Sequence, residues 1–184
     1  MWYAAFLLIQ TDGPAAEAEA SSAVEVLRPR ATQVSMTADA AEAARLTAVR
    51  RAALPALEAI GRVLIEDVCV PRSRLADAAA ALSAVANETG VAIYTFAHAA
   101  DGNLHPIVVL SDHQKPTDQR VQDAADRIFR TALSLGGTVT GEHGVGILKR
   151  RWMGVELGED VLDIQRRLKS VFDPRGILNP GRAI

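Results

Sequence analysis

The chain lacks several features that would place it in other classes of protein. It has one cysteine among 184 residues, so no disulfide can form within it, and a reducing compartment suits it. Its formal net charge is −2 and no lysine-rich tract occurs, which argues against binding of nucleic acid or of an anionic membrane surface. The apolar run at 1–9 is far shorter than the ~20 residues of a membrane span. A globular protein of the cytoplasm is expected.

What is present favours a sizeable core. Hydrophobic residues make up 49% of the chain, and acidic and basic residues are interspersed among them, as in globular domains. The run at 1–9 is expected to be a buried strand that ends at the turn-forming residues 11–14. Because this strand begins almost at the first residue, we expect the chain to be a fragment cut at a domain boundary. Cys69, in the apolar run 63–70, is expected to be a small buried hydrophobic residue.

Strands and helices are expected to alternate along the chain. Apolar, β-rich runs predict strands at 1–9, 31–36, 63–70, 91–96 and 104–110, and helical periodicity predicts helices at 15–27, 39–60, 73–88 and 117–135. Two successive strands joined by a short Asp-Gly connection indicate a hairpin, which implies antiparallel pairing. The predicted fold class is therefore α+β, a ferredoxin-like sandwich with a mixed, mainly antiparallel sheet and helices packed on one face.

Two histidines flank the expected hairpin turn. His98 and His105 lie symmetrically about Asp101 and Gly102, so a two-residue loop would place them directly opposite each other, with Cβ atoms about 5 Å apart. Two imidazoles so placed can share a divalent metal, and with Glu142 they would make the ligand set of an open catalytic zinc site. The alternative is that each histidine is a hydrogen-bonded core residue and that Asp-Gly is only a turn.

A glycine-dense segment at 136–146 surrounds a Glu-His pair. Glycine lets the backbone approach a ligand closely, but neither Gly-Lys-Ser/Thr nor the Gly-x-Gly-x-x-Gly spacing occurs, so a phosphate cradle is not indicated. Adjacent side chains of a strand point in opposite directions. If Glu142 binds a metal, His143 should therefore point toward the substrate and be free to act as a base. The alternative is a tight turn with a surface histidine. His113, in a polar loop, is expected to be solvated.

The residues at 172–182 also carry a distinctive pattern. Two prolines and two glycines lie there among apolar residues, which predicts an irregular segment docked on the rest of the chain rather than a frayed tail. By itself, this pattern fits a packing role as well as a binding site.

Three motifs occur in a fixed order along the chain. They are His98-Ala-Ala-Asp-Gly-Asn-Leu-His105-Pro, Gly141-Glu-His-Gly-Val-Gly146 and Asp173-Pro-x-Gly-x-x-Asn-Pro-Gly181. Together they strongly resemble the C-terminal FAD-linked oxidase domain, the substrate-side half of the D-lactate dehydrogenase, glycolate oxidase and D-2-hydroxyglutarate dehydrogenase group of vanillyl-alcohol-oxidase-type flavoproteins. The resemblance covers nearly the whole chain. It implies that 1–184 is a substrate or cap domain, that 171–184 is a docked, flavin-proximal tail, and that an N-terminal FAD-binding domain is absent here.

The resemblance also assigns roles to the histidine and glutamate residues. His98, His105 and Glu142 match the family's ligands for a divalent metal, which we expect to be zinc. His143 matches the general base that takes the proton of the substrate hydroxyl. The implied metal acts as a Lewis acid on that hydroxyl.

Contacts to substrate and flavin are implied in the same way. Arg50 matches an arginine that holds the substrate carboxylate, although Thr47 replaces a tryptophan common before it, and Arg51 is the alternative for this role. Asn179 matches the asparagine near the flavin ring. Arg182 stands where the family usually has lysine.

Two further stretches match the family. Lys149 and Arg150 follow the glycine-dense segment as in family members, with a solvated basic face as the alternative. The stretch at 67–71 matches as well and is expected to be structural.

The implied function is that of a flavin-dependent dehydrogenase or oxidase of 2-hydroxy acids of the D-lactate, glycolate or D-2-hydroxyglutarate type, in which hydride passes to FAD and a 2-keto acid forms. The expected partners are a small 2-hydroxy acid and the FAD-binding domain of the same full-length protein, with a homo-oligomer as a further expectation. The sequence does not identify the electron acceptor. Peripheral attachment of the full-length enzyme to the inner membrane is an alternative location.

Two other functions stay open: a metal-dependent hydrolase that uses the same His2Glu set, and a non-catalytic assembly module.

Overall fold

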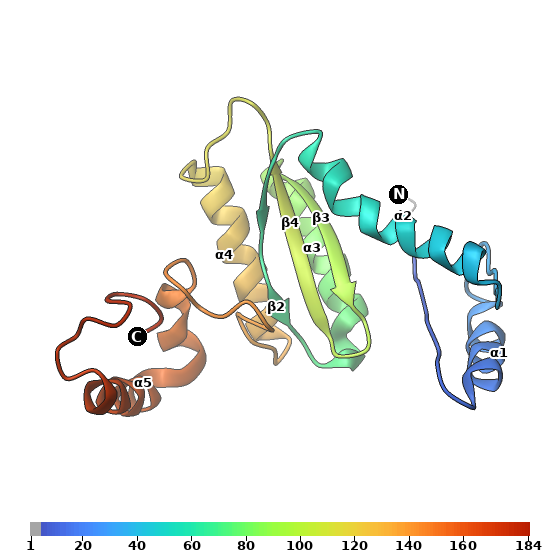
Figure 1. Cartoon of the computed structure of the whole chain (residues 1–184). Coiled ribbons are helices and arrows are strands. Elements are labelled where there is room, and N and C mark those ends of the chain that lie inside the picture. Colours follow the sequence, from blue (N-terminus) through green and yellow to red (C-terminus); the bar gives the residue numbers. More distant parts are fainter. Residues whose placement is uncertain (1–4) are drawn as a thin grey trace. The chain divides into compact units, whose positions relative to one another are not determined.

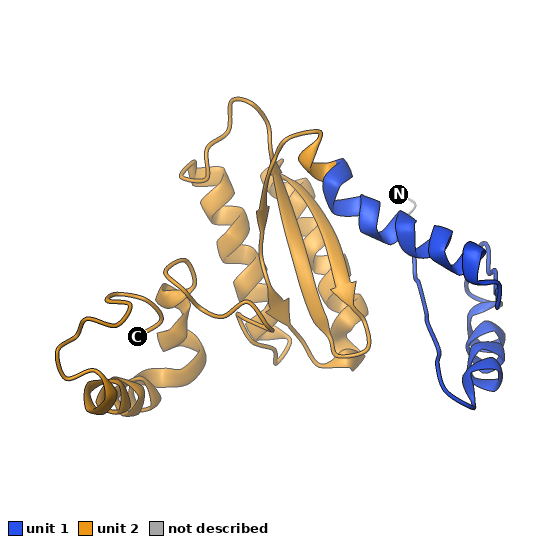
Figure 2. Ribbon diagram, viewed as in Figure 1, with its two compact units in different colours: residues 1–56 blue, residues 57–184 orange. Residues whose placement is uncertain are grey.

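The computed structural model describes residues 5–184 of the chain. The chain divides into two compact units, Met1–Ala56 and Leu57–Ile184 (Figure 2). All strands of the described residues lie in the second unit, so its sheet is built without the first.

Two helices dominate the first unit. Helix α1 spans Ala16–Leu27, and helix α2, which continues into the second unit, spans Ala40–Glu58. Both lie close to their predicted bounds. Asp39 caps α2, because its Oδ1 atom accepts the backbone N–H of Glu42 at 2.8 Å and satisfies one of the free N–H groups of the first turn.

Two predicted strands do not form within residues 5–184. Residues 5–9 and 31–36 belong to no strand, and Phe6 and Met36 are exposed. The prediction of strands is therefore wrong for residues 5–9 and 31–36. An apolar, β-rich run becomes a strand only when another strand offers a free edge, and no strand in the described part of the chain pairs with either run. Residues 1–4, the start of the first predicted strand, lie outside the described residues.

The second unit is built on a sheet with one central strand. Its strands are β1 (Arg62–Ile65), β2 (Val68–Cys69), β3 (Ala92–His98) and β4 (Asn103–Leu110) (Figure 1). Strand β4 pairs with β1 and β2 along one side and with β3 along the other, always antiparallel. The strand predicted at 63–70 is thus two short strands with a break between them.

The order of the elements confirms the predicted α+β class. An isolated antiparallel bridge joins Cys69 to Thr138, on the side of β2 that faces away from β4. The order across the sheet is then Thr138, β1 with β2, β4 and β3, and a helix precedes β3 and another precedes Thr138. This is the split β-α-β arrangement of the ferredoxin-like sandwich.

Helices cover one face of this sheet, as predicted. Helix α3 (Leu75–Thr89) follows the 3-10 turn η1 (Arg72–Arg74), and helix α4 (Gln119–Ser134) follows the β3–β4 hairpin (Figure 1). Both helices bury an apolar stripe against the sheet, and this burial is the main stabilising contribution to the unit. The buried residues of the stripes are Ala78, Leu82, Val85, Val121, Ala124, Ile128, Phe129 and Ala132.

The chain after the glycine-dense segment forms a helix that the sequence pattern does not predict. The 3-10 turn η2 (Arg150–Trp152) leads into α5 (Met153–Phe172), which is interrupted at Gly158, where φ is 76°. Trp152 is buried against Phe129 of α4, with ring centroids 5.9 Å apart. Two glycines near the start of α5 obscure its helical period. Within residues 5–184, no helix combines the length and the apolar character needed to cross a membrane.

Candidate functional site

The β3–β4 hairpin carries two predicted metal ligands in a register that differs from the expected one. His98 pairs with Asn103, and His105 pairs with Phe96, so the connection has four residues and the histidines are not directly opposite. The prediction of a two-residue Asp-Gly turn is wrong because the glycine closes a longer loop. Gly102, with φ of 82°, donates its N–H to the carbonyl oxygen of His98 at 3.1 Å.

The changed register still leaves both histidines on one face of the hairpin. Side chains alternate along a strand, so a displacement of two positions keeps a side chain on its face, and diagonal neighbours remain within reach. The rings of His98 and His105 meet edge to face, with centroids 5.2 Å apart. The predicted proximity of the two imidazoles is therefore present.

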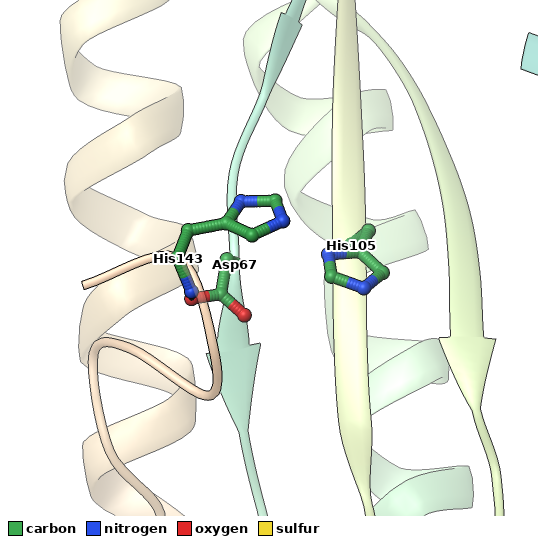
Figure 3. Close-up of side chains that lie close together, drawn as sticks. All are labelled: Asp67, His105 and His143. Carbon is green, nitrogen blue, oxygen red and sulfur yellow. The ribbon is translucent and has the colours of Figure 1, made fainter.

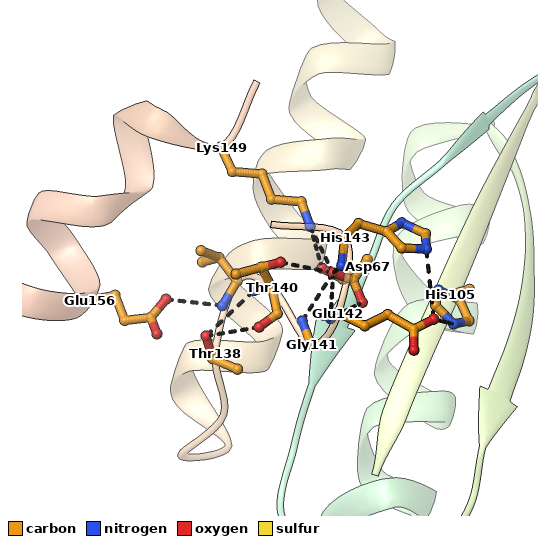
Figure 4. A network of polar contacts seen from close by, with 10 residues as sticks. Asp67, His105, Thr138, Thr140, Gly141, Glu142, His143, Lys149 and Glu156 are labelled. Atoms are coloured by element: carbon orange, nitrogen blue, oxygen red, sulfur yellow. Dashed lines mark hydrogen bonds and ion pairs between the residues drawn. The ribbon is translucent and has the colours of Figure 1, made fainter. Parts of the chain in front are cut away.

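Glu142 brings its carboxylate to three histidines. Its Oε1 atom lies 3.1 Å from Nε2 of His105, 3.7 Å from Nε2 of His143 and 3.8 Å from Nε2 of His98. Figure 4 shows this carboxylate beside two of the rings. His98, His105 and Glu142 each offer a ligand atom within 4.8 Å of the other two. Because imidazole nitrogens and carboxylate oxygens are the donors of open zinc sites, this set can hold a divalent metal.

His143 lies beside this set and does not point away from it. Its ring stacks on the ring of His105, with centroids 5.0 Å apart and planes 21° apart. Opposite directions for Glu142 and His143 were expected from strand geometry, and this expectation is wrong because residues 141–146 form no strand. With 46% of its side chain exposed, His143 is accessible to a small molecule.

His105 is the most buried of the three clustered histidines, with 12% of its side chain exposed. Burial lowers the pKa of His105, and His143 lowers it further, which favours the neutral ring that metals bind. Asp67 and Glu142 act in the opposite direction without reversing the shift. The buried Nδ1 atom has no hydrogen-bond partner within residues 5–184. A buried polar atom without a partner is uncommon in a purely structural core histidine, so Nδ1 favours the interpretation of His105 as a ligand.

A second group of potential ligands overlaps the first. Asp67, His105 and His143 also place one ligand atom each within 4.8 Å of one another (Figure 3). The carboxylate of Asp67, however, is already surrounded by hydrogen-bond donors of the protein. A metal would have to displace these donors, so the set of His98, His105 and Glu142 is the better candidate.

Asp67 holds the segment that carries Glu142 and His143 (Figure 4). The residue is fully buried, and its Oδ2 atom accepts the backbone N–H groups of Gly141 at 2.9 Å, Glu142 at 3.1 Å and His143 at 3.0 Å. The hydroxyl of Thr140 donates to the same oxygen at 2.8 Å. Burial acts to raise the pKa of Asp67, but the N–H of His143, the Thr140 hydroxyl and a lysine ammonium outweigh it and hold the pKa far below its ordinary value. Asp67 is therefore ionised at neutral pH.

The lysine is Lys149, which is buried beside Asp67. Its Nζ atom donates to the carbonyl oxygen of Asp67 at 2.6 Å and to Oδ2 at 3.2 Å. A solvated basic face is thus the wrong interpretation for Lys149, whereas Arg150 is exposed. Sequence reasoning missed the role of this pair. The available signal was the presence of two acidic residues, Glu66 and Asp67, inside the otherwise apolar run 63–70, since a charge is costly to bury without a partner.

A similar pair holds the C-terminal tail. The Oδ1 atom of Asp173 accepts the N–H of Ile177 at 2.9 Å, and its Oδ2 atom accepts the N–H of Leu178 at 3.0 Å and the Nζ of Lys169 at 2.7 Å. The Lys169 ammonium lowers the pKa of Asp173, and the two N–H groups add to this against the opposing effect of burial. The irregular tail is therefore ordered by specific contacts.

Asn179 lies in this tail and lines a hollow beside the glycine-dense segment. Its φ is 45°, in the left-handed region that asparagine tolerates. The hollow, of about 410 Å³, is also lined by Gly146, Leu178 and Arg182. The N–H of Ala183 donates to the carbonyl oxygen of Gly146 at 2.8 Å, which joins the tail to the glycine-dense segment. A flavin contact of Asn179 stays a prediction.

The remaining predicted residues lie outside this cluster. Arg50 and Arg51 are exposed residues of α2 in the first unit, and the role of either in binding a carboxylate stays a prediction. His113 is exposed, as predicted, and Cys69 is only partly buried.

Comparison with known proteins identifies the family. The family model described as FAD linked oxidases, C-terminal domain, matches residues 3–183, which is nearly the whole chain. The chain belongs to this family. The resemblance inferred from the three motifs is thereby confirmed.

Relatives of this FAD-linked oxidase domain are larger proteins. The glycolate oxidase subunit GlcD of Bacillus subtilis is 41% identical over 182 residues, which cover 97% of this chain and 39% of the relative. The glycolate oxidase subunit GlcD of Escherichia coli K12 is 29% identical over 163 residues, 86% of this chain and 32% of the relative. A probable mitochondrial D-lactate dehydrogenase of Danio rerio is 36% identical over 118 residues, 64% of this chain and 24% of the relative. The chain thus spans less than two fifths of these relatives, and none of the three is named a hydrolase.

Proposed function

We propose that this FAD-linked oxidase domain is the substrate-side part of a flavin-dependent dehydrogenase or oxidase of 2-hydroxy acids. The observation that carries the proposal is the convergence of three imidazoles on the carboxylate of Glu142. Relatives named glycolate oxidase subunit and D-lactate dehydrogenase support the substrate class, because glycolate and D-lactate are both 2-hydroxy acids. The product is the corresponding 2-keto acid.

His98, His105 and Glu142 are proposed to hold a divalent metal, with zinc as the metal that suits these donors. The fit rests on the chemistry of the donor set and on the environment of His105, which favours its neutral form. When bound, the metal supplies Lewis-acid stabilisation to the substrate hydroxyl oxygen, and FAD supplies the acceptor for the hydride of C2. The FAD is proposed to be bound mainly by another domain of a longer protein, as the length of the relatives suggests.

His143 is proposed to take the proton of the substrate hydroxyl on Nε2. The imidazole is exposed enough to meet a small molecule, and it lies beside the ligand set rather than within it. Once protonated, the ring would be stabilised by Glu142, whose Oε1 atom lies 3.7 Å from Nε2. Stacking on His105 restricts the plane of the ring and so limits the directions in which Nε2 can point.

Arg50, or Arg51 beside it, is proposed to hold the substrate carboxylate. A guanidinium group can bind a carboxylate through two parallel hydrogen bonds and so fixes its orientation. Both arginines are exposed and make no ion pair within residues 5–184, which leaves them free for a ligand. Asn179 and the tail at 171–184 are proposed to face the flavin and its domain.

A metal titration tests the ligand set in the 184-residue chain. Co²⁺ serves as the probe because its visible absorption reports coordination by nitrogen and oxygen. We expect weak uptake of Co²⁺ alone and stronger uptake when glycolate or D-lactate is present. The double variant His98→Ala/His105→Ala should lose this uptake, and His113→Ala, which removes an exposed histidine elsewhere, should retain it. Unchanged uptake in the double variant would show that the ligand assignment is wrong.

A chimera tests the reaction. The matching 182 residues of the Bacillus subtilis relative are replaced with this chain, so that the remaining part of that protein is present. Anaerobic addition of glycolate or D-lactate should bleach the visible absorbance of the flavin. In the chimera, His143→Ala should slow this bleaching by about 10²–10⁴-fold with metal content unchanged. Normal flavin reduction in that variant would exclude the base role of His143.

A further inference from the structure

We propose that Asp67 is a positioning residue for the histidine cluster: its buried carboxylate fixes the backbone at 140–143, so that Glu142 and His143 present their side chains to His105. The metal-binding consequence rests on the function proposed above. The positioning itself can be measured without a metal.

The geometry around Asp67 differs from that of an ordinary ion pair. Its Oδ2 atom accepts three consecutive backbone N–H groups, those of Gly141, Glu142 and His143, at 2.9 to 3.1 Å. Three successive N–H groups can meet one oxygen only if the backbone curls around it, so the carboxylate selects one conformation of this segment. The Nζ of Lys149, three residues after the glycine-dense segment, binds the same oxygen.

The same residue is tied to the strand that carries His105. Val68, next to Asp67, pairs with Leu104, next to His105, in the β2–β4 ladder. On the other side of Asp67, the N–H of Glu66 donates to the carbonyl oxygen of Pro106 at 2.9 Å. The backbone of Asp67 is therefore fixed relative to His105, and its side chain transmits this position to residues 141–143.

No strand or helix holds the backbone of residues 140–146. Without the Asp67 carboxylate, Glu142 and His143 would be attached to the sheet only through the bridge of Thr138 to Cys69 and through side-chain contacts. Gly141 adds a close approach, since a Cβ atom there would lie 2.3 Å from Oδ1 of the buried Asn103. The backbone N–H groups of the two site residues on this segment are thus held by one carboxylate.

The substitution Asp67→Asn tests the proposal, with Asp173→Asn as the matched control. Both replace an aspartate that binds backbone N–H groups and a lysine, but only the first binds the segment of Glu142 and His143. In Asp67→Asn we expect the amide protons of Glu142 and His143 to exchange about tenfold faster or more, because a charged acceptor is lost. We also expect the nuclear Overhauser contact between the His105 and His143 rings to weaken. In Asp173→Asn both readouts should match the wild type.

Co²⁺ affinity in the presence of glycolate separates positioning from mere stability. A structural role alone predicts that folded Asp67→Asn binds Co²⁺ as the wild type does, whereas positioning predicts a loss of about tenfold or more. The proposal is overturned if Asp67→Asn is folded and keeps wild-type exchange at residues 142 and 143. If the wild type binds no Co²⁺, the proposed metal site fails, and the exchange and ring contact still decide the positioning.

The milder variant Thr140→Val covers the case in which Asp67→Asn does not fold. It removes one hydroxyl donor from Oδ2 of Asp67 and leaves the carboxylate and the backbone donors in place. We expect faster exchange at Glu142 and His143 and a loss of Co²⁺ affinity of about threefold, consistent with one hydrogen bond. Faster exchange with unchanged ring contact and unchanged Co²⁺ affinity would overturn the proposal.

Discussion

Two irregular segments of the second unit are held by the same kind of contact, and they differ in how far apart the contact partners lie in the sequence. The Asp67 anchor, defined as Asp67 with Lys149, holds residues 140–143, whereas the Asp173 anchor, defined as Asp173 with Lys169, holds residues 177–178. In both, an aspartate accepts backbone N–H groups while a lysine binds the carboxylate and a carbonyl oxygen. The same combination of an aspartate, a lysine and backbone N–H groups thus joins distant parts of the chain in the Asp67 anchor and neighbouring residues in the Asp173 anchor.

The two anchors also differ in burial. In the Asp67 anchor, 7% of the lysine side chain and none of the aspartate side chain are exposed, whereas in the Asp173 anchor these fractions are 29% and 4%. A buried charge that loses its partner cannot turn to water, so the cost of breaking the anchor should rise with burial. The comparison predicts that the distant anchor is the one on which the fold depends.

The largest expected effect comes from deleting each carboxylate. Asp67→Ala leaves Lys149 buried without a counter-ion and should lower the free energy of unfolding by about 3–5 kcal/mol. Asp173→Ala should lower it by less, because Lys169 can reach solvent. Urea unfolding followed by circular dichroism measures both. Equal losses in the two variants would contradict the assigned importance of burial.

The second largest effect is expected in the pH dependence of the free energy of unfolding, which should differ between the two anchors. The pKa of each aspartate is lowered in the folded chain, and on unfolding it returns to about 4. The unfolded state therefore takes up protons first, so the stability that each group contributes above about pH 4 is lost as the pH falls below that value. Between about pH 5 and pH 2, the free energy of unfolding should fall less steeply for Asp67→Asn than for the wild type. For Asp173→Asn the slope should change by a smaller amount.

Replacing a glycine by alanine in each anchored segment should destabilise the fold for a different reason. In Gly141→Ala the added Cβ atom meets the side chain of buried Asn103, which should cost about 1–3 kcal/mol and displace the neighbouring Glu142. Gly176 has open space around it and a φ of 63°, so Gly176→Ala should cost only the strain of that backbone conformation, about 1 kcal/mol. Urea midpoints give the costs. A loss of the contact between the His105 and His143 rings should accompany only the first.

The smallest effect is expected for an ion pair without backbone donors. Arg127 and Glu88 form such a pair on the surface, with about half or more of each side chain exposed. Arg127→Gln should change the free energy of unfolding by at most about 1 kcal/mol, because exposed pairs gain little over hydrated charges. A larger loss in the same urea assay would show that pairing alone, without burial, explains the anchors.

Much of the fold could be predicted from the sequence because its signals are local. Helices α1 to α4 and the β3–β4 hairpin follow from periodicity and from Asp-Gly, which act within a few residues. The runs at 5–9 and 31–36 have the same apolar signal but form no strand. Whether a run pairs depends on a partner strand elsewhere in the chain, which the run itself does not reveal. The hairpin register was missed by two positions because a four-residue loop and a two-residue loop can carry the same Asp-Gly pair.

The candidate site also combines local contacts, which could be predicted from the sequence, with a long-range contact, which could not. The spacing of His98 and His105 indicates their proximity, because a hairpin brings close only residues that are near in the sequence. The motif that begins at Asp173 likewise points to an ordered tail, since the contacts of Asp173 with Ile177 and Leu178 lie within five residues. The contact of Asp67 with residues 140–143 depends on how the whole ferredoxin-like unit folds, and no spacing rule contains it.

The ion pair of Asp67 and Lys149 joins residues 82 positions apart, and this has a kinetic consequence. Contacts of such sequence separation carry a high loop-closure entropy and form only after the intervening chain has collapsed. The lysine at 169 can meet its aspartate within a single helical turn, which takes well under a millisecond by ordinary helix dynamics. The histidine cluster should therefore be among the last features to assemble, so that a partly folded chain would carry every one of its side chains without yet having a binding centre.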